Sequence, residues 1–250
     1  MHYFVLTLEG KEGYFEIPIH HHLLIQAALY DLLEDDFARF LHDRGFQFGK
    51  RSFKLFVFSR LIGKFDLLKR EGKIRFIGPT HLYVSSPLDE FNDAIMNAIL
   101  RDDGLRLGQT FLQIKNIEYR KWDMPEGESF LVRTMSPITV YSTLFKADGR
   151  KYTHYYHPRE KDFSELIRSN LLKKYLLLHG EAPEDSRLQV DPVGEVKEHI
   201  LMYKGTVIKA YGGTFRLTGS RELMQIAFEA GISVKNSQGF GFIEPILERR

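Results

Sequence analysis

Histidine side chains are the main candidates for chemistry in this sequence, which contains ten histidines and no cysteine. An imidazole with an ordinary pKa near ~6.5 can donate or accept a proton at neutral pH, so it can act as a general acid or base. His42 lies near the end of an expected short helix, on a different face from Phe37 and Phe40, so it need not be buried. A histidine near a helix C-terminus is also a favourable cap, and from the residues alone capping is the commoner role.

A basic, aromatic segment follows His42. Residues 44–75 contain ten Lys or Arg residues against two acids, a local excess of +8. Aromatic rings are interleaved with them, among them those of Phe46, Phe48, Phe53, Phe56 and Phe58. Cations mixed with rings suit a polyanion whose bases can stack. A solvated strand face could have the same composition, so charge alone does not separate the two interpretations.

A glycine-rich stretch near the end of the chain, GISVKNSQGFGF at 231–242, is the second candidate site. It is not a dinucleotide fingerprint, because Glu244 occupies the last glycine position and the order is helix, loop, strand. No phosphate-binding G-x-x-x-x-G-K-[ST] occurs, so a nucleotide cofactor is not expected. The stretch also resembles the aromatic strand of RNA-recognition domains, although Gln238 and Pro245 depart from that motif. A purely structural loop after a helix that ends at Gly231 is the alternative.

The elements that must position these residues follow the same order in both halves of the chain. In the first half we expect strands at 2–8, 53–61, 73–79, 80–86 and 109–122, and helices at 20–33, 37–44 and 88–102. Asp35 or Asp36 should cap the second of these helices and Gly45 should end it. Ser86, Pro87 and the acids after them mark the start of the third, which should stop at Gly104.

The segment MPEGES, residues 124–129, has the composition of a linker or tight turn. After it we expect strands at 130–142, 194–203, 205–219 and 239–247, and helices at 162–178 and 221–230, the last capped by Ser220. The order β-α-β-β-α-β therefore occurs twice. The sequence predicts an α+β fold of two tandem ferredoxin-like (RRM-like) domains with antiparallel sheets, at 1–123 and 124–250.

The bulk composition, 43% hydrophobic and 27% charged, is that of a globular protein. No apolar run approaches the ~18 residues of a membrane span, and Glu9 comes too early for a signal peptide. We therefore expect a cytoplasmic protein without membrane contact.

The segment GTFRLTGSRELMQIAFEAGISVKNSQGFGFIEP resembles the C-terminal signature of the CRISPR-associated endoribonucleases that process precursor CRISPR RNA, a repeat-RNA-cutting group within the RAMP superfamily. Their glycine-rich loop has the form G-x-G-x-K-N-S-x-G-F-G, and Ser233 replaces one glycine here. The matching residues are Gly231, Lys235, Asn236, Ser237, Gly239, Phe240 and Gly241. Comparable segments occur across the chain, for example FEIPIHHHLLIQAALYDLL and FSELIRSNLLKKY. The resemblance implies a loop that holds RNA between the two domains.

The resemblance also implies catalytic roles. The family carries an acid or base histidine in a similar context to His42, and a tyrosine that orients the nucleophile in a position like that of Tyr30. A family lysine steadies the phosphate, and here Lys54 is the first choice, with Lys50 and Arg51 as neighbouring RNA-binding residues. The expected reaction is attack by an RNA 2′-hydroxyl on the adjacent phosphate, without metal. It leaves a 2′,3′-cyclic phosphate and a 5′-hydroxyl.

No cofactor and no metal are expected. His20, His21 and His22 point about 100° apart on a helix and cannot share one ion, and no H-E-x-x-H spacing supports zinc. The triplet is expected on the polar surface or in a secondary RNA contact. His154 and His157 are expected in a hairpin.

The partner implied by the resemblance is CRISPR repeat RNA, as precursor and as product. Association with a CRISPR effector complex and formation of a homodimer stay open. The alternative function is a non-cleaving RNA-binding subunit of such a complex with the same tandem fold.

Overall fold

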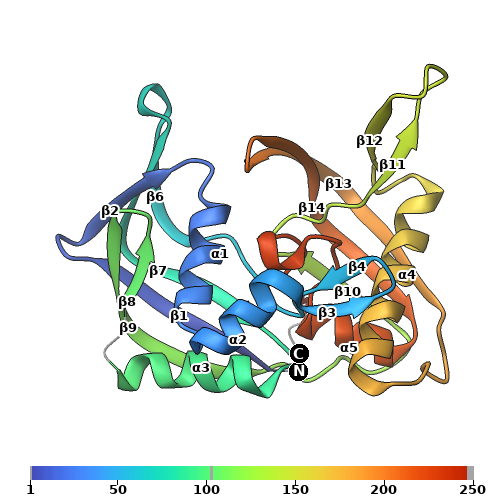
Figure 1. The fold of residues 1–250 in the computed structure, drawn as a ribbon, viewed down its shortest axis with the longest axis horizontal. Helices are drawn as coiled ribbons and strands as arrows, with labels where there is room; N and C mark the ends of the chain where they lie inside the picture. Colours follow the sequence, from blue (N-terminus) through green and yellow to red (C-terminus); the bar gives the residue numbers. More distant parts are fainter. Residues whose placement is uncertain (1, 102–103, 247–250) are drawn as a thin grey trace.

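The computed structural model describes residues 2–101 and 104–246, which form two large β-sheets with helices packed against them (Figure 1). Neighbouring strands in both sheets pair in antiparallel fashion. The chain passes from the first sheet to the second through residues 122–128. The predicted α+β fold with tandem ferredoxin-like units is confirmed.

The first sheet has seven strands. Its path runs β2 (Tyr14–Pro18), β7 (Lys73–Ser85), β1 (His2–Gly10), β9 (Thr110–Lys121) and β8 (Gly104–Leu107), and β5 (Val57–Phe58) and β6 (Ile62–Leu68) also pair with β7. Its main helices are α1 (His22–Asp31) and α3 (Asp89–Leu100). Ser86 Oγ accepts a hydrogen bond from the Leu88 amide at 3.1 Å, so the serine marks the start of α3 as predicted.

Strand β1 is apolar on both faces because both faces are covered. Phe4 and Leu6 join the large core that includes α1 and α3. The alternate residues Tyr3 and Val5 pack in a separate cluster with Phe242 of the second half. A strand with alternating apolar and polar residues would be half-exposed, whereas this continuous apolar run is typical of a strand buried on both faces.

The second sheet has four strands in the order β13 (Leu188–Tyr203), β14 (Thr206–Gly219), β10 (Ser129–Thr134) and β15 (Ile243–Pro245). Helices α4 (Lys161–His179) and α5 (Arg221–Glu229) bury their apolar residues with it in the large core. Ser220 caps α5 as predicted, because its Oγ accepts from the Leu223 amide at 3.2 Å. Such a cap satisfies a backbone donor that the helix leaves unpaired.

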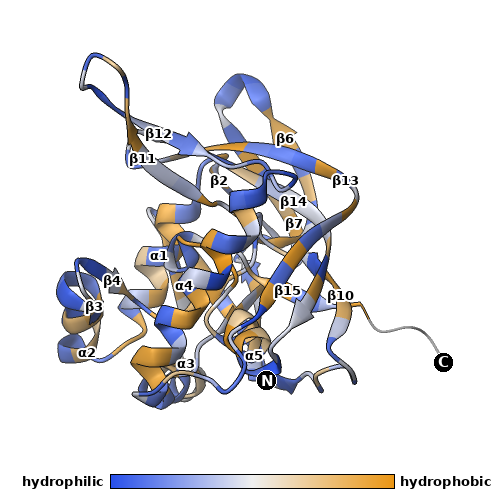
Figure 2. Cartoon of the chain, turned by 90° about the vertical axis from the view of Figure 1, so that its right-hand side faces the viewer, coloured by the Kyte–Doolittle hydropathy of each residue, from blue (hydrophilic) through white to orange (hydrophobic). Residues whose placement is uncertain are grey.

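Two short hairpins lie outside the large sheets. β3 (Phe46–Phe48) pairs with β4 (Arg51–Phe53), and β11 (Tyr141–Phe145) pairs with β12 (Lys151–Tyr155). Figure 2 shows the hydrophilic turn between β11 and β12 projecting from the body of the molecule. Figure 1 shows the β3–β4 hairpin in front of α4, and β3 contacts that helix. The first half of the chain thus reaches across to the second.

Several expectations about the elements were wrong. The predicted strand 53–61 is broken, because Leu55 has a φ of 54° and only Val57–Phe58 pairs with β7. The two strands expected at 73–86 form one strand, β7. The sequence patterns missed β2, β6 and β8, which are short or mostly exposed. The predicted ends at 102 and 247 lie outside the described residues.

The expected cap of the second helix was also wrong. α2 (Asp35–Arg39) begins after Glu34, and the two aspartates lie in its first turn rather than at the cap. There they face the positive end of the helix dipole, which favours acids for the same reason. None of the helices in the described part of the chain is long and apolar enough to cross a membrane.

Candidate active site

His42 lies in a π-helical turn, Phe40–Arg44, that continues α2. Leu41 is fully buried and anchors the turn, whereas the side chain of His42 is 68% exposed. Gly45 ends the turn with a φ of 61°, and a Cβ there would lie 2.6 Å from the Phe53 carbonyl oxygen. Glycine is therefore required where the chain turns back into the β3–β4 hairpin. The result is an accessible imidazole on a short, irregular helix, a feature common at functional sites.

The imidazole has an acidic neighbour on one side. His42 Nδ1 lies 2.8 Å from Asp43 Oδ1, and this contact holds the pKa of Asp43 below its ordinary value. Because Nδ1 is engaged by a carboxylate, Nε2 is the nitrogen left for proton transfer. The Tyr30 ring meets His42 edge to face, with 6.0 Å between ring centroids. Burial raises the pKa of Tyr30, so its hydroxyl stays protonated and can donate a hydrogen bond.

A cavity of about 400 Å³ lies between α1 and α2, beside the imidazole. Its charged and titratable lining residues are Tyr30, Asp31, Asp35, Arg39, His42 and Asp43. Three carboxylates against one guanidinium make this side unfavourable for a phosphate. A polyanion is therefore expected to approach the imidazole from another side.

Lys54 is the basic neighbour of His42. Its Nζ donates a hydrogen bond to the His42 carbonyl oxygen at 2.9 Å, and partial burial lowers the pKa of the lysine. The left-handed residue Leu55 follows at once, so the chain turns after Lys54 and buries both Leu55 and Phe56. The break in the predicted strand thus separates the lysine from the core.

A second cavity, of about 230 Å³, joins Lys54 to the glycine-rich loop. The polar residues that line it include Lys54 from the first half of the chain, and Lys174, Lys235, Asn236 and Ser237 from the second. Lys235 Nζ lies 5.1 Å from the centre of the Tyr141 ring, which also lines the cavity. Lys54 therefore contacts the main chain of His42 and lines the same cavity as the predicted loop residues Lys235, Asn236 and Ser237.

The glycine-rich loop, residues 231–242, is held by left-handed glycines and buried polar side chains. Gly231, Gly239 and Gly241 have φ values of 80°, 86° and 82°, which favour glycine. Ser233, which replaces a family glycine, donates its hydroxyl to the Thr139 carbonyl at 2.8 Å. Serine in place of the family glycine therefore has a structural role, because its hydroxyl bonds the loop to the main chain at Thr139.

The other predicted loop residues divide into two groups. Lys235 and Ser237 are half-exposed beside the cavity. Asn236 is buried and its Nδ2 donates to the Phe240 carbonyl at 2.9 Å, while the Phe240 ring is fully buried. In this conformation the Phe240 ring cannot stack on a base. Asn236 and Phe240 shape the loop from within.

Lys50 and Arg51 lie exposed at the turn and edge of the β3–β4 hairpin. Burial lowers the pKa of Lys173 on α4, and the charge of Arg51 adds to this effect, so the arginine side chain approaches that helix. Lys50 and Arg51 belong to the hairpin that crosses in front of α4 (Figure 1). Ser52, Phe53 and Lys54, which follow them directly, line the second cavity.

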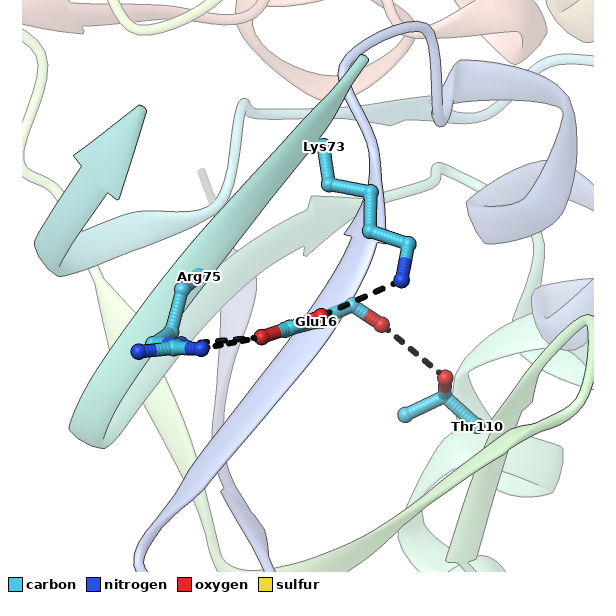
Figure 3. A network of polar contacts seen from close by, with 4 residues as sticks. All are labelled: Glu16, Lys73, Arg75 and Thr110. Atoms are coloured by element: carbon cyan, nitrogen blue, oxygen red, sulfur yellow. Dashed lines mark hydrogen bonds and ion pairs between the residues drawn. The ribbon is translucent and has the colours of Figure 1, made fainter. Parts of the chain in front are cut away.

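The rest of the basic segment lies elsewhere. Glu16 on β2 accepts hydrogen bonds from Lys73 at 3.2 Å and from Arg75 at 2.6 Å, and its main-chain oxygen accepts from Thr110 (Figure 3). These two cations are partly neutralised on a solvated strand face. The strand-face interpretation therefore applies in β7, and the polyanion interpretation stays a prediction for the residues near Lys54.

The expectation for the histidine triplet was wrong for two of its members. His21 and His22 are buried, at 9% and 6% exposure. His22 Nδ1 lies 3.0 Å from the Gln238 carbonyl oxygen, and its ring packs against Phe58 and Phe240. Burial lowers the pKa of His22 to about 4, so it is neutral and donates to the loop. The pattern of polar and apolar residues around His22 could not indicate this contact, because Gln238 lies 216 positions later in the chain.

The remaining histidines do not line either cavity beside His42. His154 lies in β12, as the hairpin prediction required, with Nε2 3.2 Å from a Glu160 oxygen, and the His157 ring packs on Tyr211 just after that strand. Among the described residues, no group of three or more His, Cys, Asp or Glu side chains could hold a metal ion.

Comparisons with known proteins match both halves of the chain. Residues 16–118 match the family described as CRISPR-associated protein Cas6, N-terminal, and residues 118–245 match CRISPR associated protein Cas6, C-terminal. The chain is 25% identical over 237 residues to the CRISPR-associated endoribonuclease Cas6 1 of Methanocaldococcus jannaschii, covering 93% of this chain and 89% of that protein. It is 27% identical over 248 residues to the CRISPR-associated endoribonuclease Cas6 of Pyrococcus furiosus, covering 96% and 87%.

The fold has solved counterparts. A structure described as an RAMP protein binding different RNA substrates superposes with a TM-score of 0.82 over 99% of this chain and 100% of that chain. The sequence identity in that pair is 22%, so the likeness concerns the fold.

Proposed function

The chain belongs to the Cas6 family of CRISPR-associated proteins, and we propose that it is an endoribonuclease that cuts CRISPR repeat RNA by attack of a ribose 2′-hydroxyl on the adjacent phosphate. The attack forms a new bond from the 2′-oxygen to phosphorus and breaks the bond to the 5′-oxygen. The products are a 2′,3′-cyclic phosphate and a 5′-hydroxyl. The reaction needs proton transfer and positive charge, and no metal ion.

One observation carries the proposal. Lys54 donates to the main chain of His42 and also lines the cavity of the glycine-rich loop. Lys54 therefore links the turn that carries the imidazole to the loop that is proposed to hold RNA.

Each catalytic group has a role that fits its surroundings. Nε2 of His42 transfers a proton, because Nδ1 is held by Asp43. Lys54 has two N–H donors beyond the one bound to His42, and they stabilise the charge on the pentacoordinate phosphorus. The protonated hydroxyl of Tyr30 orients the sugar and the imidazole.

The RNA strand is proposed to pass along the basic hairpin into the second cavity. Lys50 and Arg51 contact its phosphates from one side, and Lys235 and Ser237 contact them from the other. Gly231, Gly239 and Gly241 let the backbone turn tightly, and the loop so formed carries Lys235 and Ser237 at the cavity. Asn236 and Phe240 support the same loop from inside.

The test is single-turnover cleavage of repeat RNA in EDTA with wild type and with His42→Ala. General acid–base groups contribute about 10²–10⁴-fold, so the variant should cut at least about 100-fold more slowly. Its RNA affinity should stay within about threefold, since the imidazole is exposed and makes no part of the loop. His154→Ala is the matched control and should cut at the wild-type rate, because that histidine lies away from both cavities.

A substrate with a 2′-deoxy sugar at the cut position should bind and stay intact. Cleavage of this substrate, or an absolute need for magnesium, would exclude the mechanism. Tight binding of repeat RNA with no cleavage of the all-ribose substrate would instead identify the chain as the non-cleaving RNA-binding subunit.

The cellular location and the other partners stay predictions. The resemblance and the composition of the chain are the only basis for a cytoplasmic location, for association with a CRISPR effector complex and for a homodimer.

A further inference from the structure

We propose that Lys174 is a positioning residue whose buried ammonium group fixes the glycine-rich loop in the form that holds RNA. The inference rests on the proposed function of that loop. Lys174 lies on α4, 57 residues before Gly231, and it is 3% exposed. It touches no RNA in this proposal and acts through the loop.

The ammonium group is surrounded by oxygen atoms of one short segment. Nζ lies 2.6 Å from the Gly231 carbonyl and 3.2 Å from the Ala230 carbonyl, where α5 ends. It also lies 2.5 Å from Asn236 Oδ1 and 3.4 Å from the Ser233 carbonyl. The last carbonyls of a helix carry partial negative charge, so a cation is favourable there. One lysine thus bridges the end of α5 to the middle of the loop.

A second bond carries this constraint to the far end of the loop. Asn236, whose oxygen accepts from Lys174, donates its Nδ2 to the Phe240 carbonyl. Added atoms would not fit there, because a Cβ at Gly231 would lie 2.2 Å from the Asn236 side chain and a Cβ at Gly241 would lie 3.0 Å from it. The Lys174 ammonium, the Asn236 amide and the two glycines therefore pack as one unit. Loss of the ammonium would remove the donor that holds Asn236 in this unit.

Packing alone does not explain a lysine at this position. Burial of an ammonium is costly unless its donors are satisfied, and a methionine would fill similar space without that cost. The four acceptors around Nζ are carbonyl or amide oxygens, which have no charge. The positive charge is therefore not cancelled locally. It adds to the field of Lys54 and Lys235, which line the same cavity.

The charge of Lys174 should respond to pH in the neutral range. Burial lowers its pKa to about 7, and desolvation is the sole cause of that shift. The titratable residues on these elements and around the cavity include Lys54, Tyr141, Lys173, Tyr175, Glu222, Glu229 and Lys235. As the pH rises through 7 the amine loses its charge and one of its three donors. The loop should then loosen, and RNA affinity should fall.

The experiment measures binding of uncleavable 2′-deoxy repeat RNA by fluorescence anisotropy between pH 6.0 and 9.0. For wild type we expect the Kd to rise about tenfold from pH 6.5 to 8.5, the size of a change of about 1.4 kcal/mol. Lys174→Met should bind at least about tenfold more weakly at pH 6.5 and show little of this pH dependence. Lys174→Arg, whose side chain stays charged, should bind tightly across the range.

Lys161→Met is the control on the same helix, since Lys161 is exposed and away from the loop. It should match wild type at every pH. A circular dichroism spectrum of each variant checks that it folds, and if Lys174→Met does not fold, the wild-type profile against Lys174→Arg decides. The assignment is overturned if Lys174→Met binds like wild type, or if wild-type affinity does not change with pH.

Failure of this inference can be distinguished from failure of the proposed function. A wild-type protein that neither binds nor cuts repeat RNA contradicts the function. A wild-type protein that does both, beside an equally active Lys174→Met, contradicts the role of Lys174 alone.

Discussion

The turn that carries His42 has neighbours of both charges. Asp43 and two further carboxylates line the larger cavity beside the imidazole, and Lys54 binds the main chain of His42 and lines the loop cavity. Asp43 is 59% exposed, so its contact with the imidazole contributes little to stability. We expect Asp43 to orient the imidazole, because its carboxylate binds Nδ1 and leaves Nε2 for proton transfer.

Asp43→Asn should therefore separate rate from affinity. Without the carboxylate the imidazole is held less firmly, so the single-turnover cleavage rate should fall about tenfold. RNA affinity should rise slightly, because one negative charge leaves the neighbourhood of a polyanion. Asp35→Asn is the matched control. Asp35 lines the same cavity, but the carboxylate that contacts the imidazole is that of Asp43. An equal fall in rate for both variants would contradict an orienting role for Asp43.

Residues differ in how far the sequence could indicate their roles. His42 was predicted from the family resemblance, because the order of residues alone favours a capping role for a histidine at a helix end. Lys174 was not, because a lysine in an amphipathic helix is normally exposed and nothing local distinguishes it from Lys173. Its burial depends on oxygen atoms 56 to 62 positions later in the chain. Contacts of that kind follow from the fold and not from periodicity.

Elements with a strong periodic pattern and a cap were predicted well, and those shaped by a turn were not. α4 and α5 have long apolar stripes, and α5 also has Ser220 and Gly231 at its ends. The segment 53–61 has the aromatic content of a strand, but Leu55 turns the chain and buries apolar residues on both sides of the bend. Composition alone could not reveal that turn, since a leucine with positive φ is rare and costly.

The first turn of α1 gives a prediction about acid stability. His22 is neutral in the folded protein, with a pKa of about 4 that lies below its ordinary value because of burial. The unfolded chain therefore binds more protons between about pH 4 and 6.5, and the free energy of unfolding should fall as the pH drops through that window. The shift corresponds to about 3 kcal/mol at most. His22→Gln should lose this part of the dependence, measured by urea unfolding at pH 5.0 and 7.5.

His20→Gln is the control for that measurement, because His20 is exposed in the same triplet. It should keep the wild-type difference between the two pH values. If His22→Gln keeps the same difference, the contact with Gln238 does not hold a neutral imidazole in solution.

At the scale of the whole molecule, the glycine-rich loop is where the two halves meet. It is bonded to Thr139 and Lys174 of the second half and to His22 of the first. The single tryptophan, Trp122, lies at the same junction, with its ring 4.0 Å from that of Tyr3 and 5.9 Å from that of Phe242. Its fluorescence should therefore report whether the halves are docked. The proposed RNA site lies across this junction, so docking and RNA binding should fail together.

Gly239→Ala tests that dependence on docking. Gly239 has a φ of 86°, and a Cβ there would lie 2.6 Å from the Phe58 ring and 2.7 Å from His22, both in the first half. Gly205→Ala is the matched control, because its φ is 73° with open space around it. Each variant should lose about 1–2 kcal/mol to the left-handed backbone, and Gly239→Ala should lose about 1–3 kcal/mol more from the clash. Urea unfolding followed by Trp122 fluorescence should show the larger loss, with weaker RNA binding in Gly239→Ala alone. Equal losses in the two variants would mean that the loop does not dock the halves.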